Sequence, residues 1–118
     1  MAATATGSDG VGGADGAAPV LEETFTSAVR LRICAYLSGC EEADFKAVQE
    51  YCGLSQPNLS KNVTVLAERG YVEVGKVASG RYTKTRLRLT ATGQSVLDAH
   101  VAALQQIVDS ARAHRTRG

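Results

Sequence analysis

The chain has 118 residues, a length typical of a single domain, and its 13 lysines and arginines against 12 acidic residues give a net charge of +1. Its Gly/Ala-rich start lacks the basic and apolar regions of a secretory signal, and no apolar run is long enough to span a membrane. The three cysteines are an odd number in a chain without an export signal, so we expect reduced thiols and a cytoplasmic protein.

The first 19 residues are expected to form a disordered tail. They contain five glycines and six alanines without any periodicity. Residues 1–24 carry four acidic residues and no basic residue, so the rest of the chain has a net charge of +5. We expect residues 20–113 to form one folded domain and residues 114–118 to form a second disordered tail.

Two short helices are predicted at the start of the domain. Apolar residues recur at three-residue spacing in a helix from Thr26 to Leu37, and a Ser-Gly pair ends it. Asp44 is a suitable N-cap for the second helix, which Gly53 ends after two turns.

A third helix is predicted over residues 55–69. Its buried stripe is Leu59, Val63 and Leu66, and the opposite face is polar. The second and third predicted helices are short and are joined by a tight glycine-containing turn, and the third has a polar outer face. This arrangement is typical of a helix-turn-helix.

A two-stranded hairpin is predicted over residues 71–89, because apolar and basic residues alternate along its second half. Residues 69–88 hold six basic residues and one acidic residue, a net charge of +5 that indicates an anionic partner. A basic hairpin directly after a helix-turn-helix makes a winged helix. The predicted fold class is therefore α+β, a winged helix-turn-helix with a three-helix core, a two-stranded β-wing and a long C-terminal helix.

The polar face of the third helix and the wing carry the candidate DNA contacts. Short or flexible hydrogen-bonding side chains suit base edges and phosphates in a major groove, and the helix N-terminus can accept a phosphate. We expect the basic side chains to attract phosphates, and Gln56, Asn58, Ser60 and Thr64 to contact bases. The predicted DNA-binding residues are Ser55, Gln56, Asn58, Ser60, Lys61, Asn62, Thr64, Lys76, Arg81, Tyr82, Lys84 and Arg86. Each feature alone is typical of solvated surface, but their order along the chain favours DNA binding.

The segments AVRLRICAYL, FKAVQEYCGLSQPNLSKNVTVLAERGYVEV and GRYTKTRLRLTATG resemble the small winged-helix repressors related to the MarR and ArsR groups. The resemblance covers about residues 20–108. It implies a dimer with the third helix in the major groove and the wing over a phosphate backbone or the minor groove. It also implies contacts from Ser60 and Lys61, and from Arg81 and Lys84 in the wing.

Three positions depart from the pattern of that family. Asn62 stands where such proteins often have histidine, and Thr83 stands where the wing usually has proline. Tyr82 replaces a residue that is commonly basic. These departures concern the phosphate contacts and leave the fold intact.

The last helix is predicted from about residue 91 to 113. Leu97, Val101, Leu104 and Val108 repeat at four- and three-residue spacing, which is the pattern of a heptad seam. We expect these residues to form a dimer interface, with palindromic DNA half-sites about one helical turn apart. An amphipathic helix that only covers the core is the alternative.

Catalytic and metal sites are not expected. The chain has no metal-ligand spacing, no glycine-rich phosphate loop and no pairing of a nucleophile with a base. Cys34 and Cys52 occupy apolar positions, and acidic residues near Cys40 disfavour its thiolate. We therefore predict a protein that is not an enzyme and that needs no cofactor or metal.

Together these patterns predict a cytoplasmic, homodimeric regulator that binds specific sequences of double-stranded DNA and acts as a repressor. A membrane partner is not expected, and a small-molecule effector is left open. Two alternatives remain. One is a winged helix that contacts another protein through its basic hairpin, and the other is a repressor that responds to a ligand or to thiol oxidation.

Overall fold

The computed structural model describes residues 19–117, without the side chains of the last two. The predicted N-terminal tail, residues 1–19, lies outside the described residues apart from Pro19. The described chain falls into two compact units, one of residues 22–99 and one of residues 19–21 with 100–117. Within the described chain, every helix is too short or too polar to cross a membrane.

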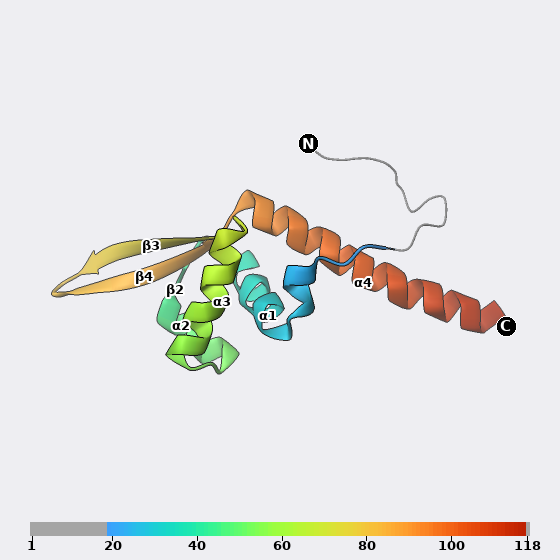
Figure 1. Cartoon of the computed structure of the whole chain (residues 1–118), viewed down its shortest axis with the longest axis horizontal. Coiled ribbons are helices and arrows are strands. Elements are labelled where there is room, and N and C mark those ends of the chain that lie inside the picture. Colours follow the sequence, from blue (N-terminus) through green and yellow to red (C-terminus); the bar gives the residue numbers. More distant parts are fainter. Residues whose placement is uncertain (1–18, 118) are drawn as a thin grey trace. The chain divides into compact units, whose positions relative to one another are not determined.

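The first unit contains three complete helices, the first part of a fourth, a 3-10 turn and a small sheet (Figure 1). Figure 1 shows the hairpin of the last two strands extending away from these helices. The sheet is antiparallel, with strand order β2-β4-β3. The elements in chain order are η1 (Glu23–Thr26), α1 (Ala28–Ser38), β2 (Ala43–Asp44), α2 (Phe45–Cys52), α3 (Gln56–Glu68), β3 (Val72–Ser79), β4 (Tyr82–Leu89) and α4 (Ala91–Arg117), which continues into the second unit.

The predicted winged-helix fold is confirmed, with one addition to its sheet. The wing was predicted to have two strands, but β2 adds a third strand that pairs with β4. Ala43 lies opposite Leu87 in this pairing, and both side chains are buried. The extra strand therefore fixes the base of the wing to the segment that precedes α2.

The helix ends also differ from the predicted ones. The first helix begins at Ala28 and not at Thr26, because Thr26 belongs to the 3-10 turn that precedes it. The Ser27 hydroxyl caps the helix by accepting a hydrogen bond from the Arg30 N–H. The last helix runs to Arg117, although residues 114–118 were predicted to be a disordered tail. The chain has no glycine or proline between residue 94 and Gly118, so nothing local ends the helix earlier.

A single apolar core joins the elements of the first unit. The predicted stripe on α3 is buried, with Leu59 and Leu66 fully inaccessible to solvent. A left-handed C-cap at Gly53 ends α2 and allows α3 to start three residues later. The largest buried apolar side chains are Phe25, Ile33, Leu37, Val48, Leu59, Leu66 and Leu87.

Hydrogen bonds join the start of α4 to the turn that links α3 with the wing. The Thr90 hydroxyl donates to the Gly70 carbonyl at 2.7 Å, and the Thr90 N–H donates to the Tyr71 carbonyl at 2.9 Å. The same hydroxyl accepts from the Gly93 N–H at 2.9 Å, which caps the helix. This arrangement fixes the direction in which β3 leaves α3.

Glu22 connects the N-terminal 3-10 turn with the C-terminal end of α3. Its carboxylate accepts hydrogen bonds from the Thr24 N–H at 3.1 Å and from the Tyr71 hydroxyl at 3.3 Å, and it lies 3.8 Å from the Arg69 guanidinium. Partial burial raises the pKa of Glu22, but these hydrogen bonds and the arginine outweigh it, so the net pKa is lowered.

The lowered pKa predicts a pH-dependent effect of replacing Glu22 with glutamine. A carboxyl whose pKa is depressed by folding stabilises the fold above its unfolded pKa and loses this contribution as the pH falls. We expect Glu22→Gln to be less stable than the natural sequence at neutral pH, with the difference shrinking as the pH falls below the ordinary glutamate pKa of 4.5 and through the lower pKa of the folded state. Urea unfolding across this range measures it. The exposed neighbour Glu23 offers a matched control, and an equal pH dependence for Glu23→Gln would contradict the assignment.

Candidate nucleic-acid interface

The polar face of α3 is exposed, as its sequence pattern predicts. Gln56, Asn58, Ser60, Lys61 and Thr64 all lie on the surface, while the apolar stripe holds the helix on the core. The Ser55 hydroxyl accepts from the Asn58 N–H at 3.2 Å, so this residue caps the helix.

A groove of about 480 Å³ separates α3 from the inner side of the hairpin. We call it the α3–wing groove. Three of the predicted base-contacting residues, Gln56, Ser60 and Thr64, line it from the helix, and Lys76 and Thr85 line it from the strands. The Lys76 ammonium donates to the Thr85 hydroxyl at 3.3 Å. Its other lining residues are Phe45, Val63, Ala67, Glu68 and Val74, so polar and apolar side chains border the groove in similar measure.

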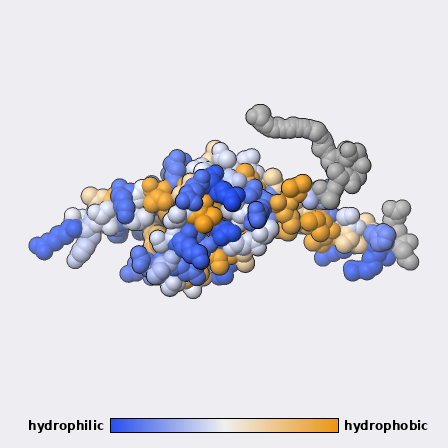
Figure 2. Space-filling model, in the orientation of Figure 1, coloured by the Kyte–Doolittle hydropathy of each residue, from blue (hydrophilic) through white to orange (hydrophobic). Residues whose placement is uncertain are grey.

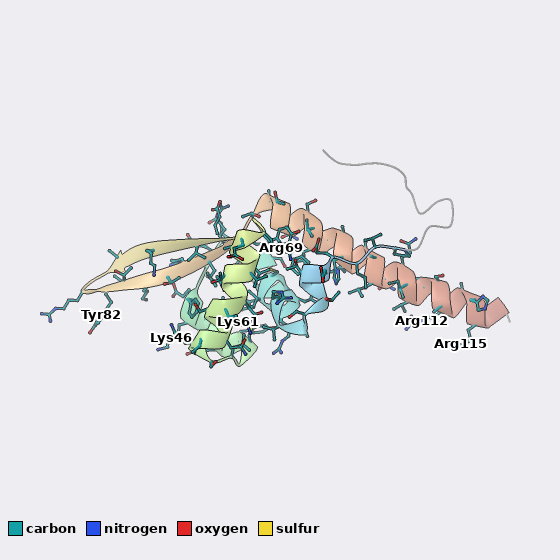
Figure 3. The ribbon with its side chains drawn as sticks, viewed as in Figure 1. Lys46, Lys61, Arg69, Tyr82, Arg112 and Arg115 are labelled. Carbon is teal, nitrogen blue, oxygen red and sulfur yellow. The ribbon has the colours of Figure 1, made fainter. Side chains whose placement is uncertain are left out.

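A second groove, of about 400 Å³, contains a basic residue that the sequence analysis missed. It lies between α2 and β4, and Lys46 lines it together with the predicted contact Lys84. Lys46 is exposed in the first turn of α2, and Figure 3 shows it projecting outward, as Lys61 does from α3. The first helix of a helix-turn-helix crosses the DNA backbone. Because Lys46 lies in that helix, the sequence could have identified it as a candidate phosphate contact.

The end of the hairpin carries two further predicted contacts. Arg81 is exposed, and Tyr82 is 77% exposed, which is high for an aromatic side chain. Figure 3 shows Tyr82 near the far end of the hairpin, and this end is hydrophilic in the space-filling view (Figure 2).

Arg86 does not lie free on the wing surface. Its guanidinium forms ion pairs with Glu42 at 3.2 Å and with Asp44 at 3.4 Å. Asp44 is its register partner in the β2–β4 pairing, which places the two side chains together. The carboxylate predicted to cap α2 makes no side-chain capping bond there. Arg86 therefore holds β2 against the base of the wing.

The charge of the wing region is partly neutralised within the unit. Arg69 is paired with Glu22 and Arg88 with Glu73, in addition to the Arg86 pairs. In the described chain, no acidic group lies within ion-pair distance of the other three basic residues in the 69–88 stretch, which are Lys76, Arg81 and Lys84. These three carry the positive charge that the wing presents to an anion.

Asn62 is buried, at 8% exposure, although it was predicted as a DNA contact. Its amide nitrogen donates to the backbone and side-chain oxygens of Asn58, each at 2.9 Å, and its amide oxygen accepts from Arg30 at 3.2 Å. Burial leaves it little surface to offer to DNA.

Two of the three cysteines lie in environments that disfavour the thiolate form. Burial raises the pKa of Cys34 to about 12, and burial also raises the pKa of Cys52 against the opposing charge of Arg32. Cys40 is exposed, with its sulfur 3.7 Å from the Leu37 carbonyl oxygen. Over residues 19–117, histidine, cysteine and acidic side chains nowhere gather in a group able to hold a metal ion.

The predicted dimer seam is divided between the two units. Leu97 is 4% exposed and packs in the core of the first unit, so it is not available to a second chain. In the second unit, Val101, Leu104 and Val108 are 37–51% exposed, and Ile107 beside them is 41% exposed. Apolar surface is visible along this part of α4 in Figure 2.

Residues 29–108 match a protein-family model described as a winged helix DNA-binding domain. The chain is also 33% identical over 84 residues to an uncharacterized protein of Methanocaldococcus jannaschii, a match that covers 70% of this chain and 90% of that protein.

Three solved structures with a similar fold are described as transcriptional regulators or their homologues. A transcriptional regulator homologue from Pyrococcus horikoshii OT3 is 26% identical, with a TM-score of 0.71 over 75% of this chain and 88% of that one. The M. tuberculosis regulator MOSR, solved with DNA, is 21% identical, with a TM-score of 0.60 over 76% and 64%. A MarR-family regulator from Silicibacter pomeroyi is 24% identical, with a TM-score of 0.58 over 71% and 56%.

Proposed function

We propose that this chain, which belongs to the winged helix DNA-binding domain family, is not an enzyme but a homodimeric, MarR-like transcriptional repressor that binds specific sequences of double-stranded DNA. Helix α3 enters the major groove, and the hairpin β3–β4 lies over the phosphate backbone or the minor groove. In this proposal the regulator is located in the cytoplasm, together with the DNA that it binds.

The observation that carries the proposal is the set of basic side chains around the polar face of α3 that form no ion pair with any acidic residue of the described chain. Lys61 lies on α3, Lys46 on α2, and Lys76, Arg81 and Lys84 on the hairpin, and all five are exposed. Phosphates need cations that are not already neutralised, and base edges need short polar groups between them. The α3–wing groove is lined by polar groups and by Lys76, and the other four cations lie on or beside the helices and strands that border it.

Contacts divide by chemistry in this proposal. The lysines, Arg81 and the α3 N-terminus capped by Ser55 bind phosphates, and Gln56, Ser60 and Thr64 in the groove contact bases, together with Asn58. Tyr82 covers the sugar-phosphate backbone at the end of the wing. Arg86 and Asn62 act within the protein instead, because each is engaged by other side chains.

The experiment that tests DNA binding is selection of bound duplexes from a random library, followed by titration of the enriched duplex at two salt concentrations. We expect enrichment of a palindromic sequence, and affinity that falls steeply with salt. A winged helix that contacts a protein partner instead predicts no binding of any duplex even at low salt, and that outcome would overturn the proposal.

The dimer is proposed to form through the exposed apolar residues of α4. Val101, Leu104 and Val108 recur at i, i+3 and i+7, so they share one face of the helix. Burying such a face against a second copy removes apolar side chains from water. Twofold symmetry would then place two α3 helices in successive turns of the major groove.

Replacing Leu104 with glutamate is expected to convert the dimer into a monomer, because a charge at the centre of an apolar interface cannot be buried without a partner. Sedimentation velocity measures the change. Gln106→Glu adds the same charge on the opposite side of α4 and is expected to leave the dimer intact. A Leu104→Glu protein that still sediments as a dimer would remove this face from the proposal.

A further inference from the structure

A line of hydrogen bonds runs from α1 to the exposed face of α3. The Arg30 guanidinium donates through Nη1 to the Asn62 Oδ1 at 3.2 Å, and Asn62 Nδ2 donates to the Asn58 Oδ1 at 2.9 Å. Arg30 is itself held by a 2.9 Å hydrogen bond from its Nε to the Thr24 carbonyl. The line begins in a half-buried arginine, passes through a buried amide and ends at an exposed one.

Arg30 determines which group donates and which accepts in each of these hydrogen bonds. A guanidinium has only donors, so the atom of Asn62 that faces it must be the amide oxygen. The amide nitrogen of Asn62 then faces Asn58, where it also donates to the Asn58 backbone carbonyl at 2.9 Å. An N–H group can only meet an acceptor, so the side-chain atom of Asn58 that faces inward must be its oxygen.

We propose that Arg30 and Asn62 are positioning residues that orient the Asn58 amide, so that Asn58 presents its NH₂ group to DNA and selects a base with an acceptor edge. The inference rests on the proposed function, since it names what one base-contacting residue recognises. Neither positioning residue touches DNA in this arrangement.

The expected base follows from the donor and acceptor pattern of the major groove. Guanine presents N7 and O6 and thymine presents O4, all acceptors, whereas cytosine presents only an amino donor and adenine presents an amino donor beside its N7 acceptor. An asparagine that contacts adenine in the usual bidentate way needs both its oxygen and its nitrogen free. Because the Asn58 oxygen points inward to Asn62 and only its NH₂ group faces outward, the adenine or cytosine amino group meets no acceptor, and guanine or thymine is favoured at the contacted position.

The test compares sequence preferences of four variants by selection from the same random duplex library. Asn58→Ala identifies the contacted position as the one whose preference is lost. Asn62→Asp keeps an acceptor for Arg30 but offers only oxygens to Asn58, so the Asn58 amide turns its NH₂ inward and exposes its oxygen. At that position we expect the preference to change from guanine or thymine to adenine or cytosine.

Arg30 supplies a matched pair of variants. Arg30→Lys keeps a donor-only group and is expected to keep the natural preference, whereas Arg30→Gln can donate or accept and is expected to broaden it. A merely structural role for these residues would lower affinity for all sequences alike. A change confined to one base position is the readout that such a role would not produce.

A second arm needs no DNA. In the free protein, we expect the Asn62 side-chain amide protons to exchange slowly with solvent and those of Asn58 to exchange fast, by nuclear magnetic resonance. In Asn62→Asp the Asn58 amide protons are expected to become protected.

The outcomes separate this inference from the proposed function. If the natural sequence enriches a site but Asn62→Asp leaves its preference unchanged, or Asn58→Ala alters no position, the inference is overturned and DNA binding stands. If the natural sequence enriches no duplex at all, the proposed function falls and the base preference falls with it. Fast exchange of the Asn62 amide protons would contradict the orientation itself.

Discussion

Replacing Gly93 with alanine is expected to lower the free energy of unfolding by about 3 kcal/mol, the upper part of the range for overpacking a filled site. A Cβ atom at this position would lie 2.3 Å from the Tyr71 carbonyl oxygen and 2.8 Å from a methyl group of Leu89. The carbonyl cannot simply move away, because it accepts the 2.9 Å hydrogen bond from the Thr90 N–H. The substitution must therefore shift α4 or the turn that leads into the wing.

Urea unfolding of the two proteins at neutral pH measures the difference. Gly75 provides the matched control, since a Cβ there meets nothing within 4 Å and its φ is not in the left-handed region. Gly75→Ala is expected to leave stability unchanged or slightly raised, because alanine restricts the unfolded chain. Equal stabilities for Gly93→Ala and the natural sequence would show that α4 can move away from Tyr71 at no cost.

The parts of the fold with local sequence patterns could be predicted. The α3 stripe repeats at helical spacing, a glycine ends α2, and basic and apolar residues alternate along β4, so each element is visible in a short window. Their order along the chain then specifies the winged helix. The face of α3 that is exposed also follows directly from the position of its buried stripe.

Strand β2 and its consequences could not be predicted in this way. It has two residues, too few for an alternating pattern, and its partner β4 lies far along the chain. Without β2, the partners of Arg86 are not apparent, and the residue looks like any other basic position on the wing. The net charge of residues 69–88 counts Arg86 as a full positive charge. In the folded protein, its ion pairs with Glu42 and Asp44, which lie outside that segment, neutralise this charge, so it is not available to DNA phosphates.

Asn62 is a different case, because the signal was present in the sequence. It stands three residues after Leu59 and four before Leu66, which places it beside the buried stripe of α3. Its polar side chain favoured an assignment to the DNA face instead. A polar residue at a buried helical position needs internal partners, and here they are Arg30 and Asn58.

Removing Arg81 and Lys84 together, as Arg81→Ala and Lys84→Ala, is expected to reduce the slope of log affinity against log salt by about two. Each is exposed on the wing without an acidic partner among the described residues, so each is available to neutralise one phosphate. Because each phosphate contact releases about 0.9 counterion, the affinity at about 0.15 M salt is expected to fall about thirtyfold. Titration of a labelled duplex over a range of salt concentrations measures both quantities.

The control is the ion pair on the same hairpin. Arg88 and Glu73 neutralise each other, and their side chains are 50% and 61% exposed. Replacing both with glutamine changes two surface residues of the wing but not its net charge, so we expect an unchanged slope. If the slope falls equally in both double variants, the wing contributes shape and not charge; if it falls in neither, the wing does not contact the phosphates. A loss confined to the Arg81 and Lys84 double variant would instead assign the attraction to the cations of the wing that have no acidic partner within residues 19–117.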